Sequence, residues 1–480
     1  MNSSTTAATS AFVEDPGSFR DRANRVYDNG VTVRRGINSD ILEHWNRLRE
    51  APFFRGLTAD GKVVATETCA GADDRWAAYL SHERIPFISY PYEWSFGMLK
   101  DAALLHLDIT EKAIAAGWTL KDATAYNVQW RGTKPVFIDV PSFEPYRPGD
   151  PWGGYRQFCM MFLYPLMLKA YRGIDYIPFL RSSLEGVDPV MADQILSGFT
   201  RLRKGVLGHV FLHSRMQNRY LNKDLDEAKS LTEEAAADGP KRAVRSKHSF
   251  AMVMGTIDGL RRTVEKLEVR DRRTTWGNYD TEHSYAAGSF DLKKEFVRKY
   301  VQAEHRKLAI DFGCNTGTFS RICAENSDYV LAVDGDEKAI DRLFRDLKGE
   351  GSRKILPLVA NLGNISPNQG WRGRERRSFD ERAQPQLILC LAIIHHIVIS
   401  ANIPLDEFLE WLKSFNASVV LEWVGPDDDM VKMLLRNRVN QYAELTECNF
   451  QAAVAKRFSI EDSVALKGGV RKLLYLRPLA

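Results

Sequence analysis

The sequence lacks the cysteine and hydrophobic patterns that mark several large classes of protein. Its six cysteines are scattered over 480 residues, without a C-x-x-C pair and without histidines at metal-ligand spacing. This excludes the common zinc-binding patterns, so we expect no bound metal and a protein of the reducing cytoplasm. The most apolar run, FCMMFLYPLMLKA, contains Pro165 and falls well short of the roughly 20 apolar residues that a helix needs to cross a bilayer. It predicts a buried helix, and no membrane partner is expected.

An excess of charge of one sign is also missing. Lys and Arg number 66 and Asp and Glu 62, and the net charge of +4 is spread without long single-sign blocks. Nothing in this distribution indicates a nucleic-acid partner, so none is expected. No repeat recurs at a fixed period, which excludes solenoids and propellers. Residues 1–18 lack the charged and apolar regions of a signal peptide, and we expect a disordered tail there.

What the sequence does contain is enough apolar material for large cores. Apolar residues make up 44% of the chain, and its 480 residues exceed what a single core usually holds. One stretch, residues 221–249, is polar and charged throughout, with a Gly-Pro pair in its middle. Such a stretch predicts a linker. We therefore expect two domains, over residues 19–220 and 250–480.

Strand-like and helical segments alternate in the second of these domains. KLAIDFG, YVLAVDGD, KILPLVAN, QLILCLAIIHH and ASVVLEWV read as buried strands, and segments with apolar residues at helical spacing separate them. Alternation of this kind predicts parallel strand pairing with right-handed crossovers. The expected fold class is therefore α/β, with a Rossmann-like doubly wound sheet and helices on both faces.

A glycine-rich turn, DFGCNTGTF, follows the first of these strands. Glycines at 313 and 317 allow positive φ and remove side chains that would block a ligand. Asp334 ends the next strand about 20 residues later, where a carboxylate can accept both hydroxyls of a ribose. Asp311 repels phosphate but can hold an ammonium. The pattern therefore predicts a nucleoside ligand that carries an amino-acid tail.

These segments resemble the motifs of class I S-adenosylmethionine-dependent methyltransferases over roughly residues 276–480. HHIVISANIPLDEFLEWL and MVKMLLRNR are similar to a narrower bacterial group, the nodulation-type methyltransferases. The resemblance implies S-adenosyl-L-methionine as cofactor, with Asn361 at the edge of the adenine. The expected cofactor-binding residues are Asp311, Gly313, Asn315, Gly317, Asp334, Gly335, Asp336, Asn361, Leu362, Trp276 and Tyr279.

Methyl transfer needs a well-placed nucleophile and, where a proton is in the way, a base. His395 and His396 follow the fourth strand, at the rim where the methyl group should point, and either is a candidate base. We favour His395, because it lies nearer the strand. The alternative is that the pair only shapes the loop. Glu422 and Trp423 end the fifth strand and are expected near the substrate.

Two further stretches have less specific interpretations. TTWGNYDTEHSYAAGSF is rich in aromatics, and Trp276, Tyr279 and Tyr285 are expected either to wall the sulfonium and the substrate or to pack in a core. WRGRERRSFDER precedes the fourth strand at the sheet end opposite the ligands. We predict that this insert is a solvated face.

The N-terminal half contains LKDATAYNVQWRGTKPVFIDV. Asp122, Asn127 and Asp139 in this segment resemble the catalytic loop and metal-binding aspartate of the α+β protein-kinase and aminoglycoside-phosphotransferase fold. The likeness spans about residues 26–186, but no G-x-G-x-x-G and no strand lysine accompany it. Three interpretations stay open: an active phosphotransferase, a substrate-presenting or regulatory module, or turn-forming residues without a catalytic role.

We interpret the chain as a two-domain cytoplasmic enzyme. It is expected to move a methyl group from S-adenosylmethionine to a small-molecule acceptor, with the N-terminal domain aiding substrate selection. The alternatives are an ATP-dependent phosphotransferase, alone or in a bifunctional protein, and a scaffold that binds the cofactor only to sense it. The sequence predicts neither the acceptor atom nor an oligomeric state.

Overall fold

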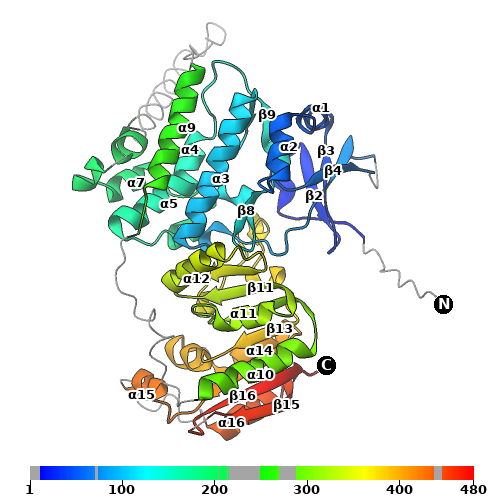
Figure 1. Cartoon of the computed structure of the whole chain (residues 1–480), viewed down its shortest axis with the longest axis vertical. Helices are drawn as coiled ribbons and strands as arrows, with labels where there is room; N and C mark the ends of the chain where they lie inside the picture. The colour runs from blue at the N-terminus through cyan, green and yellow to red at the C-terminus, as the bar shows by residue number, and fades with distance from the viewer. Residues whose placement is uncertain are drawn as a thin grey trace, which may run out of the picture.

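The computed structural model describes residues 11–70, 74–203, 205–212, 215, 249–269, 288–436, 446–466 and 468–480. Figure 1 shows two domains stacked along the long axis of the molecule, with the N-terminal elements above and the C-terminal sheet below. The predicted linker lies outside the described residues, apart from Ser249.

A five-stranded antiparallel sheet opens the N-terminal domain. Two helices, α1 (Ser39–Leu48) and α2 (Pro52–Ala59), follow its third strand, and Asn38 caps α1. β1 pairs with β2, so the prediction of a disordered tail over residues 1–18 is wrong for the residues of β1. The strands, in the order β1-β2-β3-β5-β4, are β1 (Val13–Glu14), β2 (Asn24–Asp28), β3 (Val33–Ile37), β5 (Ala78–His82) and β4 (Thr66–Cys69).

The rest of the N-terminal domain is built around a long helix, α3 (Phe96–Ala115), which buries residues along most of its length. The apolar run near Pro165 forms continuous buried helical turns, so the predicted buried helix is confirmed. No helix in the described part of the chain is long and apolar enough to span a membrane. The strands and α-helices that follow α3 up to Ile195 are β6 (Trp118–Leu120), β7 (Val128–Arg131), β8 (Lys134–Phe137), β9 (Phe143–Pro145), α4 (Tyr155–Phe158), α5 (Tyr164–Met167), α6 (Ile177–Ser182) and α7 (Pro189–Ile195).

Helix α9 (Phe250–Glu265) belongs to the N-terminal domain. It packs alongside α3, as Figure 1 shows. Lys100 Nζ on α3 donates to the backbone oxygen of Glu265, the last residue of α9, at 2.8 Å and to that of Leu267, just beyond the helix, at 2.9 Å. This helix follows the predicted boundary at residue 250 but packs on α3, because apolar spacing reveals a helix and not the domain against which it packs.

The C-terminal domain is a seven-stranded, doubly wound α/β sheet, as predicted. The first five strands pair in parallel with the order β12-β11-β10-β13-β14, so the strand order reverses beside β10. β16 runs antiparallel to both of its neighbours, β14 and β15, which departs from the parallel pairing that was predicted. A short connection joins β15 to β16 and makes the two a hairpin. The strands are β10 (Arg306–Phe312), β11 (Ser327–Asp334), β12 (Ile355–Val359), β13 (Leu387–Cys390), β14 (Ser418–Val424), β15 (Phe458–Ala465) and β16 (Arg471–Pro478).

Both faces of this sheet are buried. Ala309 and Val330 belong to a core cluster shared with the helices α10 and α12, whereas Ile310 and Leu331 point the other way into a core that continues into the N-terminal domain. This alternation is what a strand buried on both faces requires. The helices are α10 (Ser289–Ala303), α11 (Thr318–Ala324), α12 (Glu337–Gly349), α13 (Phe379–Arg382), α14 (Leu405–Ser414), α15 (Asp429–Leu435) and α16 (Glu447–Ala455).

The insert before β13 packs against the N-terminal domain. Arg382 forms a buried ion pair with Glu93 at 2.5 Å, and its guanidinium lies 4.2 Å from the ring centroid of Tyr90. Ser366 Oγ donates to the same Glu93 carboxylate at 2.6 Å. The prediction of a solvated face is therefore wrong for Arg382. The sequence could not indicate this contact, because the partner of Arg382 lies almost 300 residues away in the other domain.

Candidate functional site

The glycine turn lies at the carboxyl end of β10, beside the point where the strand order reverses. Gly313 and Gly317 both have positive φ, of 71° and 81°. A Cβ at Gly313 would lie 2.2 Å from a methyl of Ile393, and one at Gly317 would lie 2.6 Å from a methyl of Leu343. The glycines are thus required by the close approach of protein side chains as well as by the turn itself. The crevice at this edge is where doubly wound sheets bind ligands.

Asp334 ties this turn to the end of β11. Its two carboxylate oxygens accept the backbone N–H groups of Asn315 and Asp336, each at 2.9 Å. Burial raises the pKa of Asp334, and these two N–H groups oppose that shift. Each carboxylate oxygen has a second lone pair, so Asp334 retains capacity to accept ribose hydroxyls. Asp336 instead caps α12 by accepting the N–H of Lys338 at 2.9 Å.

Asp311 lies under the turn, on β10, and is only 2% exposed. Burial raises its pKa to about 7, while a 2.6 Å hydrogen bond from Ser320 Oγ and the charge of Lys293 act in the opposite direction. A carboxyl in this state gains from a nearby cation, because a positive group restores its ionised form. That Asp311 holds an ammonium stays a prediction. The sequence analysis missed Ser320 and Lys293.

Glu422 lies at the end of β14, but its side chain does not face open solvent. It is completely buried, with Oε2 2.6 Å from Lys293 Nζ and Oε1 3.4 Å from Arg471 Nη1. Trp423 points elsewhere and stacks on Phe450 at 4.6 Å between ring centroids. Glu422 thus belongs to a buried ionic cluster and Trp423 packs on Phe450. That both residues lie near the substrate stays a prediction.

The histidine pair follows β13 at the same edge of the sheet. The rings of His395 and His396 lie 4.2 Å apart, and Ala392 just before them has the uncommon φ of 57°. His395 is 1% exposed and burial lowers its pKa to about 3, whereas burial lowers the pKa of His396 with Arg471 as a second cause. Both imidazoles are neutral at pH 7. Among the described residues, Nδ1 of His395 has no hydrogen-bond partner.

The adenine-side loop follows β12. Asn361 caps a short helical turn, η9 (Leu362–Asn364), by accepting the N–H of Gly363 at 2.9 Å. This bond directs the side-chain oxygen of Asn361 toward the turn. Trp276, Tyr279 and Tyr285, which were expected either to wall the sulfonium and the substrate or to pack in a core, lie outside the described residues.

One known protein is similar to this chain over nearly its whole length. It is 32% identical over 463 residues to the nodulation protein NoeA of Rhizobium meliloti (strain 1021), across 95% of this chain and 94% of that relative. The chain therefore belongs to the NoeA family. No protein-family model matches it.

Two solved structures similar to this NoeA-family chain each cover less than half of it. The N-methyltransferase NodS from Bradyrhizobium japonicum WM9, in complex with S-adenosyl-L-homocysteine, shares 10% identity with a TM-score of 0.30, over 41% of this chain and 90% of that one. The magnesium protoporphyrin IX methyltransferase ChlM from Synechocystis PCC 6803, with bound S-adenosylhomocysteine, shares 14% identity with a TM-score of 0.30, over 44% and 90%.

In the N-terminal domain of this NoeA-family chain, the structure brings the three predicted polar residues together. Asn127 Nδ2 donates to Asp139 Oδ2 at 3.3 Å, while Arg35 Nη1 on β3 pairs with the other oxygen at 2.5 Å. Burial, and then the charge of Asp139, raise the pKa of Asp122. No cluster of three or more His, Cys, Asp or Glu residues able to hold a metal occurs within the described ranges.

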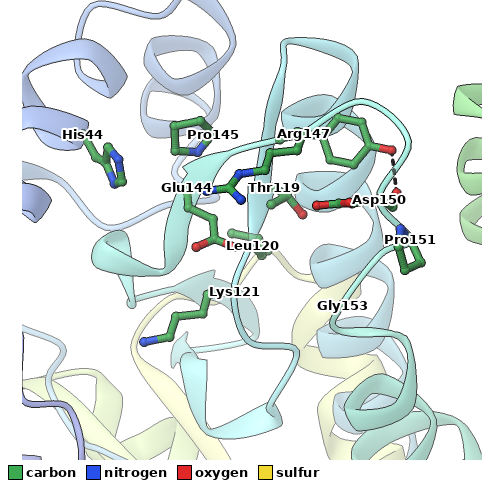
Figure 2. A pocket seen from close by; sticks show the side chains of 11 residues that line it. His44, Thr119, Leu120, Lys121, Glu144, Pro145, Arg147, Asp150, Pro151 and Gly153 are labelled. Carbon is green, nitrogen blue, oxygen red and sulfur yellow. Dashed lines mark hydrogen bonds between the residues drawn. The ribbon is translucent and has the colours of Figure 1, made fainter. Parts of the chain in front are cut away.

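A separate cavity of about 660 Å³ lies within the N-terminal domain (Figure 2). Side chains of both charges line it, including Lys121, Glu144 and Arg147, and most of them come from β6, β9 and the loop after β9. None of the residues of the glycine turn, the adenine-side loop or the histidine pair contributes to it. The sequence analysis did not single out this cavity.

Proposed function

We propose that the C-terminal domain of this NoeA-family chain is an S-adenosylmethionine-dependent methyltransferase that acts on a small-molecule acceptor. The observation that carries the proposal is the pair of acids at the carboxyl ends of adjacent strands. Asp334 ties the glycine turn to β11, and Asp311 lies buried beneath that turn with its pKa raised to about 7. One acid suits ribose hydroxyls and the other an ammonium, which are the polar groups at the two ends of this cofactor.

The bound cofactor would supply an electrophilic methyl group on a sulfonium. The chain itself would then have three tasks. Asp311 and Asp334 would hold the two ends of the cofactor, the end of β13 would place the acceptor in line with the methyl, and an imidazole would take up the proton that the acceptor loses. Asn361 would lie at the adenine edge.

Of the two histidines, His396 suits the last task better. A base is most effective when its pKa lies near the working pH, and a pKa of about 3 makes His395 a very weak proton acceptor at pH 7. His396 is less buried than His395. This reverses the preference that chain position alone suggests, because burial beside the strand weakens the base as well as fixing it.

For the N-terminal domain we propose a kinase-like fold with a substrate-selecting role rather than phosphoryl transfer. The proximity of Asn127 and Asp139 on the loop and hairpin after α3 supports the fold. The guanidinium of Arg35 occupies one oxygen of Asp139, where a kinase would need a metal ion. Phosphotransferase activity is the alternative, and a measurement of magnesium-dependent ATP turnover tests it.

We place the protein in the cytoplasm. All six cysteines are unpaired thiols, four of them buried, and none forms a disulfide. Such usage suits a reducing compartment.

The deciding experiment has two parts. Calorimetric titration of the full chain with S-adenosylhomocysteine should show saturable binding to one site, and incubation with radiolabelled cofactor and small-molecule extracts should label an acceptor. Absence of binding by folded protein would overturn the proposal. Binding without labelling of any extract would favour the sensing scaffold instead.

A further inference from the structure

We propose that Arg181, in the N-terminal domain, is a positioning residue for the adenine side of the cofactor site. It acts through the loop 361–365 of the C-terminal domain, to which its guanidinium is hydrogen-bonded. The inference rests on the proposed methyltransferase function and assigns part of its cofactor site to the other domain.

The guanidinium of Arg181 donates three hydrogen bonds to this loop. From α6, its Nη1 donates to the backbone oxygen of Asn364 at 2.7 Å, and its Nη2 donates to Asn364 Oδ1 at 2.9 Å and to the oxygen of Ile365 at 2.8 Å. Gln369 Nε2 in turn donates to the backbone oxygen of Arg181 at 2.6 Å. Hydrogen bonds from a charged donor are stronger than neutral ones, and a planar guanidinium fixes the geometry of what it binds.

The residue that Arg181 holds is bonded directly to the adenine-side asparagine. The N–H of Asn364 donates to the backbone oxygen of Asn361 at 2.9 Å, closing the turn that Asn361 caps. Asn361 and Asn364 are both exposed, so packing contributes little to fixing this turn. The hydrogen bonds from Arg181 to Asn364 therefore help to hold the turn that orients the Asn361 amide.

The helix after Asp334 is anchored to the same domain. Lys169 forms an ion pair with Glu337 in the first turn of α12, and Glu337 Oε1 also accepts the N–H of Phe96 at 3.2 Å. One turn later, Asp341 Oδ1 accepts from the N–H of Gly97 at 2.7 Å. Figure 1 shows α12 at the boundary with the N-terminal domain, below α3.

Both segments that flank the nucleoside end of the site are thus held by the N-terminal domain. One leaves the carboxyl end of β11 and the other the carboxyl end of β12, and these ends form one wall of the crevice of a doubly wound sheet. The histidines and Glu422 follow or end β13 and β14, on the other side of β10 from these two segments. Changes in the N-terminal domain should therefore alter cofactor affinity through the adenine side first.

The test is a double-mutant cycle in the full chain, with S-adenosylhomocysteine as the calorimetric probe. We expect Arg181→Ala to weaken binding about tenfold, since about 1.4 kcal/mol of loop ordering is lost. Asn361→Ala should weaken binding at least as much, and the double variant should bind no more weakly than Asn361→Ala alone. The preference for S-adenosylhomocysteine over its inosine analogue should narrow in Arg181→Ala, which a general loosening of the interface would not cause.

Arg20→Ala is the matched control. Arg20 also crosses the domain boundary, but pairs with Glu375 in the insert at 2.7 Å and touches no residue of the loop 361–365, so affinity should not change. Arg181→Gln replaces Arg181→Ala if the latter does not fold. Wild-type affinity in the Arg181 variants, or additive losses in the double variant, would overturn the inference. A wild-type chain that binds no S-adenosylhomocysteine would instead overturn the proposed function.

Discussion

Lys293 Nζ on α10 lies 2.6 Å from Oε2 of Glu422 on β14, and the two side chains are 4% and 0% exposed. A buried ion pair of this kind costs desolvation on both sides, so its net contribution to stability is small. Loss of one partner, however, leaves an uncompensated charge in the interior. Because Lys293 also acts on the pKa of Asp311, the pair connects the amino-acid end of the proposed cofactor site to the wall that carries the histidines.

Replacement of Lys293 by Met should therefore destabilise the protein by about 3–5 kcal/mol, because Glu422 loses its short partner and keeps only the longer contact to Arg471. Urea denaturation followed by circular dichroism measures this. The double variant Lys293→Met with Glu422→Leu should recover much of the loss. Lys299→Met is the control on the same helix, since Lys299 forms a solvent-accessible ion pair with Asp462. The urea concentration at the unfolding midpoint of this variant should stay close to that of the wild type.

Asp334→Ala should weaken binding of S-adenosylmethionine by roughly 2–4 kcal/mol. The change removes the acceptor for the ribose and also leaves the N–H groups of Asn315 and Asp336 without their carboxylate. Calorimetry on the folded variant gives the affinity. Asp328→Ala, an exposed acid at the start of the same strand, is the control and should bind as the wild type does. Equal affinity for wild type and Asp334→Ala would remove Asp334 from the site.

The doubly wound sheet and the two acids were predictable because their signals are local. An apolar strand, a glycine turn and an acid about 20 residues later lie within one βαβ unit, and the structure places Asp311, Asn315 and Asp334 together as that unit requires. Lys293 was not predictable in this way. It lies on the apolar side of an amphipathic helix, but its partner Glu422 follows more than a hundred residues later. Only the packing of α10 on β16, the neighbour of β14, brings the two together.

The residues of the domain interface could not be predicted from the sequence for a related reason. Arg181, Arg382 and Glu93 are charged residues of ordinary surface type, and periodicity indicates which face of an element is polar without indicating what covers it. For α9, the sequence suggested a separation between domains where the structure has a contact. A polar linker before Phe250 suggested a domain boundary, whereas the helix returns to pack on α3.

Asp311 gives a pH dependence with a definite sign. Its pKa is about 7 in the folded protein and 3.8 as the ordinary value, so the folded state binds more protons between these values. Stability should therefore decrease as pH rises from about 4 to 7, and Asp311→Asn should abolish that part of the slope. Urea unfolding at a series of pH values tests this. An unchanged slope in Asp311→Asn would contradict the assignment.

Binding of the cofactor should reverse this protonation. If Asp311 holds the ammonium, it must be ionised in the complex, so binding at pH 7 should release a fraction of a proton. Calorimetry of S-adenosylhomocysteine binding in buffers of different ionisation enthalpy measures the number released. Asp311→Asn should bind more weakly and release none. Proton release of the same size in that variant would assign it to another group.

The N-terminal polar residues offer a test between a substrate-selecting and a phosphotransferring role. Asp122→Asn with Asp139→Asn should leave methyl transfer within a few fold, and the wild type should show no magnesium-dependent hydrolysis of ATP, because Arg35 already neutralises Asp139. Asp108→Asn, which breaks the ion pair with Lys62 in the same domain, is the control. Loss of methyl transfer in the folded double variant, dependent on added ATP, would support coupled phosphoryl chemistry.

The histidine pair gives the sharpest test of the chemical step. His396→Gln should lower turnover about 10²–10⁴-fold at unchanged cofactor affinity, because proton abstraction belongs to the transition state and not to ground-state binding. His395→Gln should cost less, since a buried imidazole with a pKa of about 3 is a weak base at pH 7. Cofactor affinity by calorimetry and initial rates with labelled cofactor separate the two effects.

The pH profile decides whether the effect of His396 is chemical. Burial lowers the pKa of His396 below 6.5, so the wild-type rate should be level around pH 7 and fall only under more acidic conditions, as the imidazole gains a proton. His396→Gln should lose this acidic limb along with its rate, whereas His395→Gln should keep it. If both variants retain the wild-type rate and profile, neither histidine is the base. Catalysis then rests on placing a nucleophile that is already deprotonated beside the methyl group.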